Sequence, residues 1–143
     1  MKRINQRACI FCEIINGNSP SWKVYEDKFV IAFFDINPAN ELHTLVVPKK
    51  HSRDIYSVSK LDLEHNIVTA KRIAETYKKI FKIRDINLIH GSGSLAQQDV
   101  FHFHIHIIPR FKNDRFKLSY KTKAKVRDKF EYYIDKIKNK IKV

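Results

Sequence analysis

The sequence is poor in cysteine, glycine and proline, with two, three and four of these residues among 143. Two cysteines three residues apart exclude the disulfide framework on which many small secreted domains depend. No stretch approaches the roughly 18 consecutive apolar residues of a membrane span. Residues 1–8 are too short and too polar for the apolar core of a secretory signal. We therefore expect a protein of the reducing cytoplasm, with no membrane span and a length that fits one packed domain.

Acidic residues are also scarce, since 15 Asp and Glu face 28 Lys and Arg and leave a net charge of +13. Such an imbalance usually suggests nucleic-acid binding. Here, however, residues 112–143 hold 12 of the basic and 4 of the acidic residues, so +8 of the charge lies in the last 32 positions. The remainder carries only +5, and nucleic acid is not the expected partner. The charge divides the chain into a domain over residues 1–111 and a basic extension over 112–143.

The extension has a helical pattern of its own, with apolar residues three or four positions apart and lysines between them. The apolar positions are Val126, Phe130, Tyr133, Ile134, Ile137 and Ile141. We predict a helix that packs on the same domain or on a second subunit, because a solvated lysine face needs no partner of its own. An arm that binds a membrane surface or nucleic acid is the alternative.

Apolar periodicity predicts an α+β protein. Alternating or continuously apolar runs predict strands at residues 22–26, 29–36, 42–48, 86–90 and 101–110. Gly17 is expected to end a short helix that begins at residue 8, and one long helix runs from a cap at Ser59 to about Lys82. Its apolar positions are Leu61, Leu63, Ile67, Val68, Ala70, Ile73, Ala74, Tyr77, Ile80 and Phe81. Strands grouped around one long helix favour a mostly antiparallel five-stranded sheet.

Three histidines spaced by two, His102, His104 and His106, are the most informative feature. On a strand they point to one face, while the large apolar residues between them point to the other, where they can form core. Imidazole acts as nucleophile, acid, base or metal ligand near neutral pH, so the row indicates a chemical site. A plain metal site is the rival interpretation, because His-x-His on a strand suits one zinc ion. Three histidines on a wet strand face are the bland interpretation.

Other polar residues allow two interpretations each. Cys9 and Cys12 lie on one side of a helical turn, and in a reducing compartment they indicate a metal site or a redox pair. Asp35 stands before a turn, where it either binds a ligand or caps the turn. His65 is expected to be structural or solvated within the long helix. The turn over residues 91–98 leads into the histidines and offers backbone amides to an anion.

Several short motifs resemble those of the histidine-triad nucleotide-binding proteins. The triad pattern is met by HFHIHII at residues 102–108, and its lead-in by QDVFH at 98–102. CIFC at 9–12, AFFDI at 32–36 and HTLVVPKKH at 43–51 match in kind and order. The resemblance runs from about residue 9 to 110 and does not cover the basic extension. It implies the α+β fold of this family, a homodimer, and a bound purine nucleotide.

The resemblance also implies roles for single residues. His104 would attack the α-phosphorus and form a nucleotidyl-histidine, His106 would contact the phosphate oxygens, and Gln98 the leaving side. Asp35 would accept hydrogen bonds from the ribose. The remaining nucleotide-binding residues are Phe11, Ile14, Phe33, Ile36, Asp99 and Val100. The reaction would be hydrolysis of the P–N bond in purine nucleoside 5′-phosphoramidates. A weakly catalytic nucleotide-binding regulator and a dinucleoside polyphosphate hydrolase are the alternatives.

Structural zinc is implied as well, through Cys9, Cys12, His51 and His102. Four such ligands close a tetrahedral site, so this metal would leave His104 free as the nucleophile. Three positions depart from the family pattern. Gly91 stands where an asparagine is usual, Gln97 where a glycine is usual, and Asp99 where a small hydroxyl residue is common. An acid near a phosphate is repulsive unless it points away, so these changes bear on phosphate binding and turnover.

Overall fold

The structure is a computed structural model that describes residues 9–142. The predictions on residues 1–8 and on Val143 lie outside this range. In chain order the elements are α1 (Ile10–Ile15), β1 (Lys23–Glu26), β2 (Val30–Phe34), β3 (Thr44–Pro48), α2 (Lys60–Phe81), β4 (Asp85–Ile89), the 3-10 turn η2 (Ser94–Ala96), β5 (Ile105–Arg110), the 3-10 helix η3 (Ala124–Lys129) and α3 (Phe130–Ile137). Between residues 9 and 142, no helix is long and apolar enough to cross a membrane.

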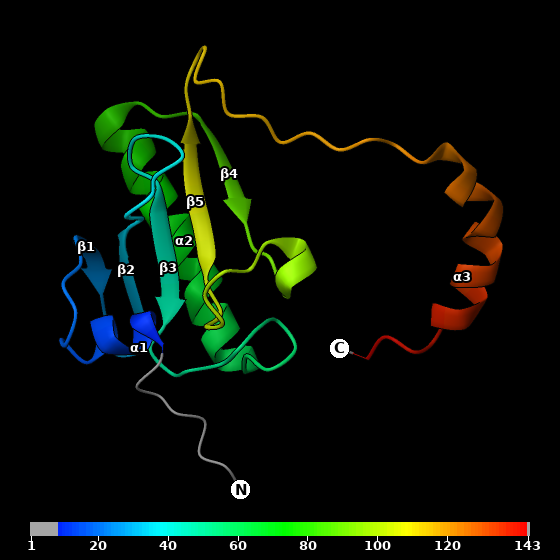
Figure 1. Ribbon diagram of the computed structural model, residues 1–143, viewed down its shortest axis with the longest axis horizontal. Coiled ribbons are helices and arrows are strands. Elements are labelled where there is room, and N and C mark those ends of the chain that lie inside the picture. Colours follow the sequence, from blue (N-terminus) through cyan, green and yellow to red (C-terminus); the bar gives the residue numbers. More distant parts are fainter. Residues whose placement is uncertain (1–8, 143) are drawn as a thin grey trace, which may run out of the picture.

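The strands form one antiparallel sheet in the order β1-β2-β3-β5-β4, which confirms the predicted α+β class. The long helix α2 covers one face of this sheet, and the short helix α1 lies at the end of the other face (Figure 1). Strand β5, which carries His106, lies between β3 and the edge strand β4. Thr44, Leu45 and Val46 of β3 pair with Ile107, His106 and Ile105 of β5, respectively.

Both faces of the sheet are buried because alternate residues of β2 and β3 point to opposite sides. On the α2 side, Val30, Ala32, Val46 and Ile107 form a core cluster with Ala70, Ile73, Tyr77 and Ile83. On the α1 side, Phe11 packs with Ile31, Phe33, Leu45 and Val47. This second cluster is the floor on which the histidine site is built.

The long helix begins and ends where the sequence predicted. The Ser59 hydroxyl accepts a hydrogen bond from the Asp62 amide at 3.0 Å, and Lys82 ends the helix in the left-handed conformation. The predicted apolar stripe was too wide, because the helix meets the sheet along one narrow face. This face includes the polar residues Asp62, Asn66 and Thr69 besides Ala70, Ile73 and Tyr77. Leu61, Ile67, Val68, Ile80 and Phe81 are each more than two fifths exposed.

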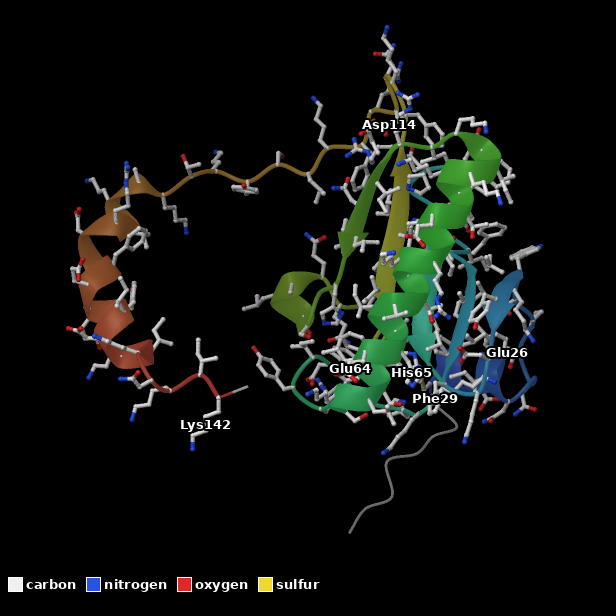
Figure 2. The ribbon with its side chains drawn as sticks, turned by 180° about the vertical axis from the view of Figure 1, so that it is seen from behind. Glu26, Phe29, Glu64, His65, Asp114 and Lys142 are labelled. Carbon is white, nitrogen blue, oxygen red and sulfur yellow. The ribbon has the colours of Figure 1, made fainter. Side chains whose placement is uncertain are left out.

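His65 lies on α2 outside the histidine site. Its ring stacks on Phe29 with centroids 3.8 Å apart and planes inclined by 11° (Figure 2). The prediction of a structural histidine agrees with this contact.

The triad strand is shorter than predicted, since β5 begins at Ile105 and residues 101–104 precede it. The neighbouring strand explains why. Pro48 ends β3 and has no N–H to donate, and its carbonyl oxygen accepts a hydrogen bond from the His102 ring at 2.8 Å. The backbone N–H of Phe103 instead donates to the Ser52 carbonyl oxygen at 2.7 Å. Residues 101–104 lack strand hydrogen bonds, but their side chains still alternate. Phe103 is buried against His90, on the opposite side from the rings of His102 and His104.

The basic extension leaves the sheet after a tight anchor. The Arg110 guanidinium donates to both carboxylate oxygens of Asp114 at 2.8 and 3.1 Å and to the Phe116 carbonyl oxygen at 2.6 Å. From Lys117 onward every described residue is exposed, and α3 stands away from the body of the molecule (Figure 1). We call residues 117–142 the arm. The predicted helix is present in shortened form, and it does not pack on its own domain.

Candidate functional site

The three triad histidines gather above the α1-side core. The ring centroids of His104 and His106 lie 4.8 Å apart, and Phe11 contacts His104 edge-on at 5.1 Å and His102 at 6.0 Å. His102 and His104 are buried, while the side chain of His106 is 26% exposed. The row therefore passes from the interior at His102 to a solvent-accessible position at His106.

Backbone partners fix the tautomer of His104. Its Nδ1 lies 2.7 Å from the His102 carbonyl oxygen, which can only accept, so Nδ1 carries the proton and Nε2 keeps a lone pair. Burial lowers the pKa of His104 below its ordinary value. The ring is thus neutral at pH 7, with an unprotonated Nε2. These are the properties of a nitrogen nucleophile.

A second chain of hydrogen bonds reaches His106 through His43. The Ala39 amide donates to His43 Nδ1 at 2.9 Å, so the proton of neutral His43 lies on Nε2. His43 Nε2 is 2.9 Å from His106 Nδ1 and donates to it, which leaves the His106 proton on Nε2. Burial lowers the pKa of His43, and burial together with the neighbouring His104 lowers that of His106 to about 4. One backbone amide therefore sets His106 as a neutral donor.

The sequence motif at residues 43–51 contains His43 but predicts no role for it. The strand register, which sequence alone does not give, places His43 beside His106. Leu45 of β3 pairs with His106 of β5, and a residue two positions before Leu45 lies on the same face as a diagonal neighbour of His106.

Asp35 lies at the rim of the same group. Its Oδ1 accepts from the Asn37 amide at 2.8 Å, which is the turn-capping role foreseen as an alternative. Its Oδ2 lies 3.5 Å from His43 Nε2 and 3.9 Å from His106 Nδ1. Asp35, His43 and His106 are close enough to hold a metal ion. The tautomers oppose this, because His43 offers N–H and not a lone pair to the centre of the group.

The residues predicted to line the base pocket are mostly together. Phe11 and Phe33 pack edge-to-face at 5.5 Å in the α1-side core, with the half-buried Ile14 and Val100 at its edge. Ile36 is 76% exposed on the turn after β2. The structure thus supplies an apolar wall beside His104.

The loop before β5 is held by the side chain of Gln98, which is buried. Gln98 Oε1 accepts from the Gly93 amide at 2.8 Å, and Nε2 donates to the carbonyl oxygens of Arg53 and Val100 at 2.7 and 3.2 Å. The predicted contact of Gln98 with the leaving group stays a prediction, since both ends of the amide are bound to backbone. Asp99 is exposed and accepts from the Val100 amide at 2.8 Å.

The structure explains the departure at Gly91 and shows why a glycine would suit position 97. A Cβ at Gly91 would lie 2.3 Å from the Ala96 carbonyl oxygen, so the loop closes too tightly for an asparagine there. Gln97 has φ +63° and ψ +27°, the left-handed conformation that favours glycine. A further histidine that sequence reasoning left without a role, His90, donates from Nδ1 to the His104 carbonyl oxygen at 2.8 Å and so fixes the backbone behind the site.

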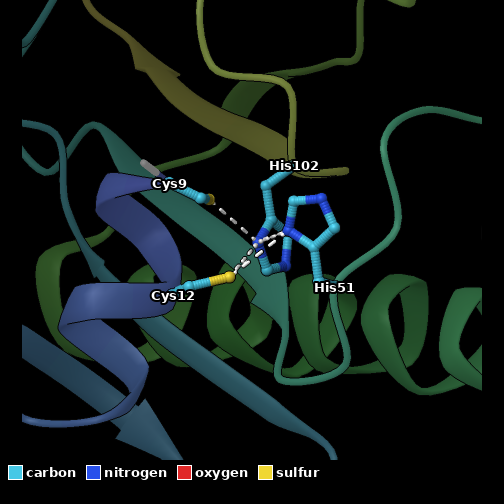
Figure 3. A group of neighbouring side chains, drawn as sticks. All are labelled: Cys9, Cys12, His51 and His102. Atoms are coloured by element: carbon cyan, nitrogen blue, oxygen red, sulfur yellow. Dashed lines mark hydrogen bonds between the residues drawn. The ribbon is translucent and has the colours of Figure 1, made fainter. Parts of the chain in front are cut away.

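The residues predicted as metal ligands converge at the other end of the triad (Figure 3). Their ligand atoms all lie within 4.8 Å of one another. Cys12 Sγ is 3.3 Å from His51 Nδ1 and 3.6 Å from His102 Nδ1, and Cys9 Sγ is 3.5 Å from His102 Nδ1. The two Nδ1 atoms are 3.2 Å apart. A tetrahedral zinc with ordinary bond lengths requires about 3.6 Å between sulfur and nitrogen and about 3.3 Å between nitrogens.

The tautomer of His102 suits a metal ligand. Its Nε2 donates to the Pro48 carbonyl oxygen, so Nδ1 presents a lone pair to the two thiols. Burial lowers the pKa of His102 to about 4, and burial followed by the hydrogen bond with Cys9 raises the pKa of Cys12 to about 12. Both shifts disfavour the charged form of the side chain, because the site is buried. A bound cation reverses this for the thiol, because coordination stabilises the thiolate.

Sequence comparison finds relatives in the HIT family. A family model described as HIT domain matches residues 16–113. An uncharacterized HIT-like protein of Borreliella burgdorferi is 47% identical over 110 residues, which cover 76% of this chain and 79% of the relative. The adenosine 5′-monophosphoramidase HNT1 of Saccharomyces cerevisiae is 39% identical over 103 residues, which cover 72% of this chain and 63% of that protein.

Solved structures agree. A HIT family protein from Bacillus anthracis is similar with a TM-score of 0.86 at 36% identity, and the match covers 94% of this chain and 98% of that one. A zinc-bound histidine triad family protein from Mycobacterium smegmatis has a TM-score of 0.75 at 29% identity, over 83% of this chain and 86% of that one. These likenesses explain why the motifs at both ends of the triad occur in one chain.

Proposed function

The chain belongs to the histidine triad (HIT) family, and on this premise we propose that it hydrolyses purine nucleoside 5′-phosphoramidates at the P–N bond. The observation that carries the proposal is the buried, neutral His104, whose Nδ1 proton is held by a carbonyl oxygen and whose Nε2 is free to attack. The adenosine phosphoramidase activity named for the yeast relative supports the P–N bond and the purine base.

The reaction runs in two displacements. His104 Nε2 attacks the α-phosphorus and the P–N bond breaks, while the leaving nitrogen takes up a proton from the solvent and departs as an amine. A water molecule then attacks the phosphorus of the nucleotidyl-histidine and gives a proton back to the solvent. The N–P electron pair returns to Nε2, so the nucleoside monophosphate is released and His104 is neutral again. Splitting one displacement into two lowers the barrier when the nucleophile is positioned beforehand. The His102 carbonyl oxygen provides this positioning and stabilises the ring when it becomes cationic.

His106 acts on the phosphate oxygens in this proposal. The relay from the Ala39 amide through His43 directs a proton on His106 Nε2 away from His43, where it is available to an oxygen that gains charge in the transition state. Asp35 would accept hydrogen bonds from the ribose with its Oδ2, while Phe11, Phe33, Ile14 and Val100 would form the wall against the base. Ile36, on the exposed turn, would contact the outer edge of the base.

Zinc is the structural metal we propose for Cys9, Cys12, His51 and His102, on the strength of the tetrahedral spacing and the His102 tautomer. When bound, the ion joins α1 to the start of the triad segment and provides no open position for substrate. The two thiols, free in this structure, also support a reducing cytoplasm as the site of action. We further propose the homodimer that the family resemblance implies.

Both ends of the Gln98 amide are hydrogen-bonded to backbone groups, so this side chain is not free to contact a leaving group. This favours a second candidate, a nucleotide-binding regulator with weak catalysis. A dinucleoside polyphosphate hydrolase is the third. Turnover of an adenosine phosphoramidate, compared with a dinucleoside polyphosphate and with AMP binding, separates them. The proposal expects faster turnover of the P–N substrate and its loss in His104→Asn. Tight AMP binding with no turnover of either substrate would favour the regulator, and faster P–O–P cleavage would favour the third candidate.

A further inference from the structure

The arm carries an apolar face that no other part of residues 9–142 covers. Val126, Phe130, Tyr133, Ile134 and Ile137 repeat at helical spacing along η3 and α3, and each is between 41% and 51% exposed. An isolated helix of eight residues is unstable in water, because too few hydrogen bonds offset the cost of nucleation. The helix therefore needs a surface against which its apolar face is buried.

The likeness to the Bacillus anthracis structure extends into the arm. Residues 112–143 make up more than a fifth of the chain, whereas that match leaves out only 6% of it and still reaches a TM-score of 0.86. Much of the arm must therefore be placed similarly in a solved structure. A detached arm keeps one position only if a surface outside its own chain holds it, and a second copy of the chain is one such surface.

The arm also leaves room for a second copy. Seven residues, 117–123, connect the anchor at Phe116 to η3, and in extended form they span up to about 23 Å, several times the spacing of about 4.8 Å between strands. The arm and α3 lie on the side of the edge strand β4 (Figure 1). On this side Leu88 of β4 and Leu95 of η2 are 43% and 105% exposed. Tyr56 is 90% exposed next to Ile55, whose amide donates to Ser92 before η2.

Charge favours contact between the arm and a body rather than between two arms. Residues 112–143 carry 12 basic and 4 acidic residues, so two arms repel each other. Residues 9–111 hold 13 basic and 11 acidic residues and are nearly balanced. A neighbouring body can therefore accept the arm without strong repulsion.

We propose that the arm, residues 117–142, is exchanged between two copies, and that the apolar face of α3 packs on the body of a second copy that occupies the space beside β4. This rests on the homodimer in the proposed function and identifies the segment that holds it. Each copy embraces the other, so the contact occurs twice in a dimer with two-fold symmetry.

The test compares two aspartate substitutions on one helix. Phe130→Asp breaks the apolar face, and Tyr132→Asp makes the same kind of change on the opposite face, where Tyr132 is 60% exposed and lies under the Lys136 ammonium. The mass of the full-length chain is followed by sedimentation over a wide dilution series, without lipid or nucleic acid. Because the contact is made twice, Phe130→Asp is expected to raise the dimer dissociation constant at least about 100-fold. Tyr132→Asp is expected to change it less than about threefold.

Three results would overturn the exchanged arm, and they differ in what survives. If the wild type dimerises and Phe130→Asp dimerises equally well, the arm is not part of the interface, while the homodimer stands. A wild type that is monomeric throughout removes the homodimer as well. If the wild-type chain is monomeric in solution and α3 gains protection from hydrogen exchange only with vesicles of anionic phospholipid, or only with RNA, the arm binds that partner instead. Thermal unfolding of both variants confirms that the body is intact.

Discussion

Two groups of side chains, one at each end of the triad, differ in what their backbone neighbours allow. Cys9, Cys12, His51 and His102 form one group; Asp35, His43 and His106 form the other. Each is close-set enough for a metal. In the first, a carbonyl oxygen binds the outer nitrogen of His102, so a lone pair faces the centre. In the second, an amide N–H binds the outer nitrogen of His43, so an N–H faces the centre.

The outer hydrogen bond sets what each inner nitrogen presents to its group, a lone pair from His102 and an N–H from His43. His104 lies between the two groups and shares features of both. A carbonyl oxygen fixes its outer nitrogen as it does for His102, but no thiol faces the inner lone pair, which is left for a substrate. We therefore propose zinc for the first group and phosphate chemistry for the second.

The largest effect is expected from His104→Asn. Removing the nucleophile should lower kcat/KM for an adenosine phosphoramidate by at least about 1,000-fold while the zinc content stays the same. His65→Asn makes the same substitution in a histidine outside both groups and should leave turnover unchanged. If the His104→Asn protein retains most of its activity, His104 is not the nucleophile.

Cys12→Ser should act on the other group. Loss of the metal is expected to lower the free energy of unfolding by about 3 kcal/mol, because the binding energy of a structural zinc contributes to folding. Metal analysis and urea unfolding measure both effects. A chelator provides the control, since it should destabilise the wild type and have little further effect on the variant. Equal sensitivity of the two proteins to the chelator would contradict the assignment.

Acid should lower the stability of the fold through His106. His106 has a pKa of about 4 in the fold against an ordinary value near 6.5, so the unfolded chain binds more protons between these values. Its contribution is complete above about pH 6.5 and is lost as the pH falls towards 4, by about 3 kcal/mol. Urea unfolding at several pH values should show a shallower acid loss in His106→Gln than in the wild type. Parallel curves would show that His106 is not held neutral.

His43→Gln should give the smallest of these effects. Without the relay from the Ala39 amide, His106 no longer has a fixed tautomer, and kcat is expected to fall about tenfold with zinc content unchanged. The readout that a merely structural role would not move is the acid limb of the pH profile of kcat, which should shift because the environment of His106 changes. An unchanged profile would leave His43 as a packing residue.

Much of the fold could be predicted from sequence because local signals and packing agree. The Ser59 cap, the helix end near Lys82 and the continuous apolar runs of β2 and β3 specify elements without reference to distant residues. The start of β5 at Ile105 could not be predicted in this way, since it depends on Pro48 of another strand and on the ring of His102. The buried face of α2 failed for a similar reason, because it depends on where the helix meets the sheet.

The candidate site divides along the same line. The triad could be predicted from its spacing, and the clustering of Cys9, Cys12, His51 and His102 from the family resemblance. His43 and His90 could not be given roles, since these come from strand register and from contacts with backbone groups of distant segments. The hydrogen bonds that hold Gln98 in the loop, and the steric restriction at Gly91, likewise could not be predicted, because both depend on backbone groups that only the fold brings close.

We propose that one end of the triad holds zinc while His104 independently forms a covalent bond with the nucleotide. Both halves of this proposal can be checked in one experiment, intact-mass and metal analysis of the protein quenched shortly after mixing with an adenosine phosphoramidate. We expect one zinc per chain and a transient adduct of one adenylyl group, with the adduct lost and the zinc kept in His104→Ala. An adduct that persists in His104→Ala, or one that disappears when zinc alone is removed from a folded protein, would contradict it.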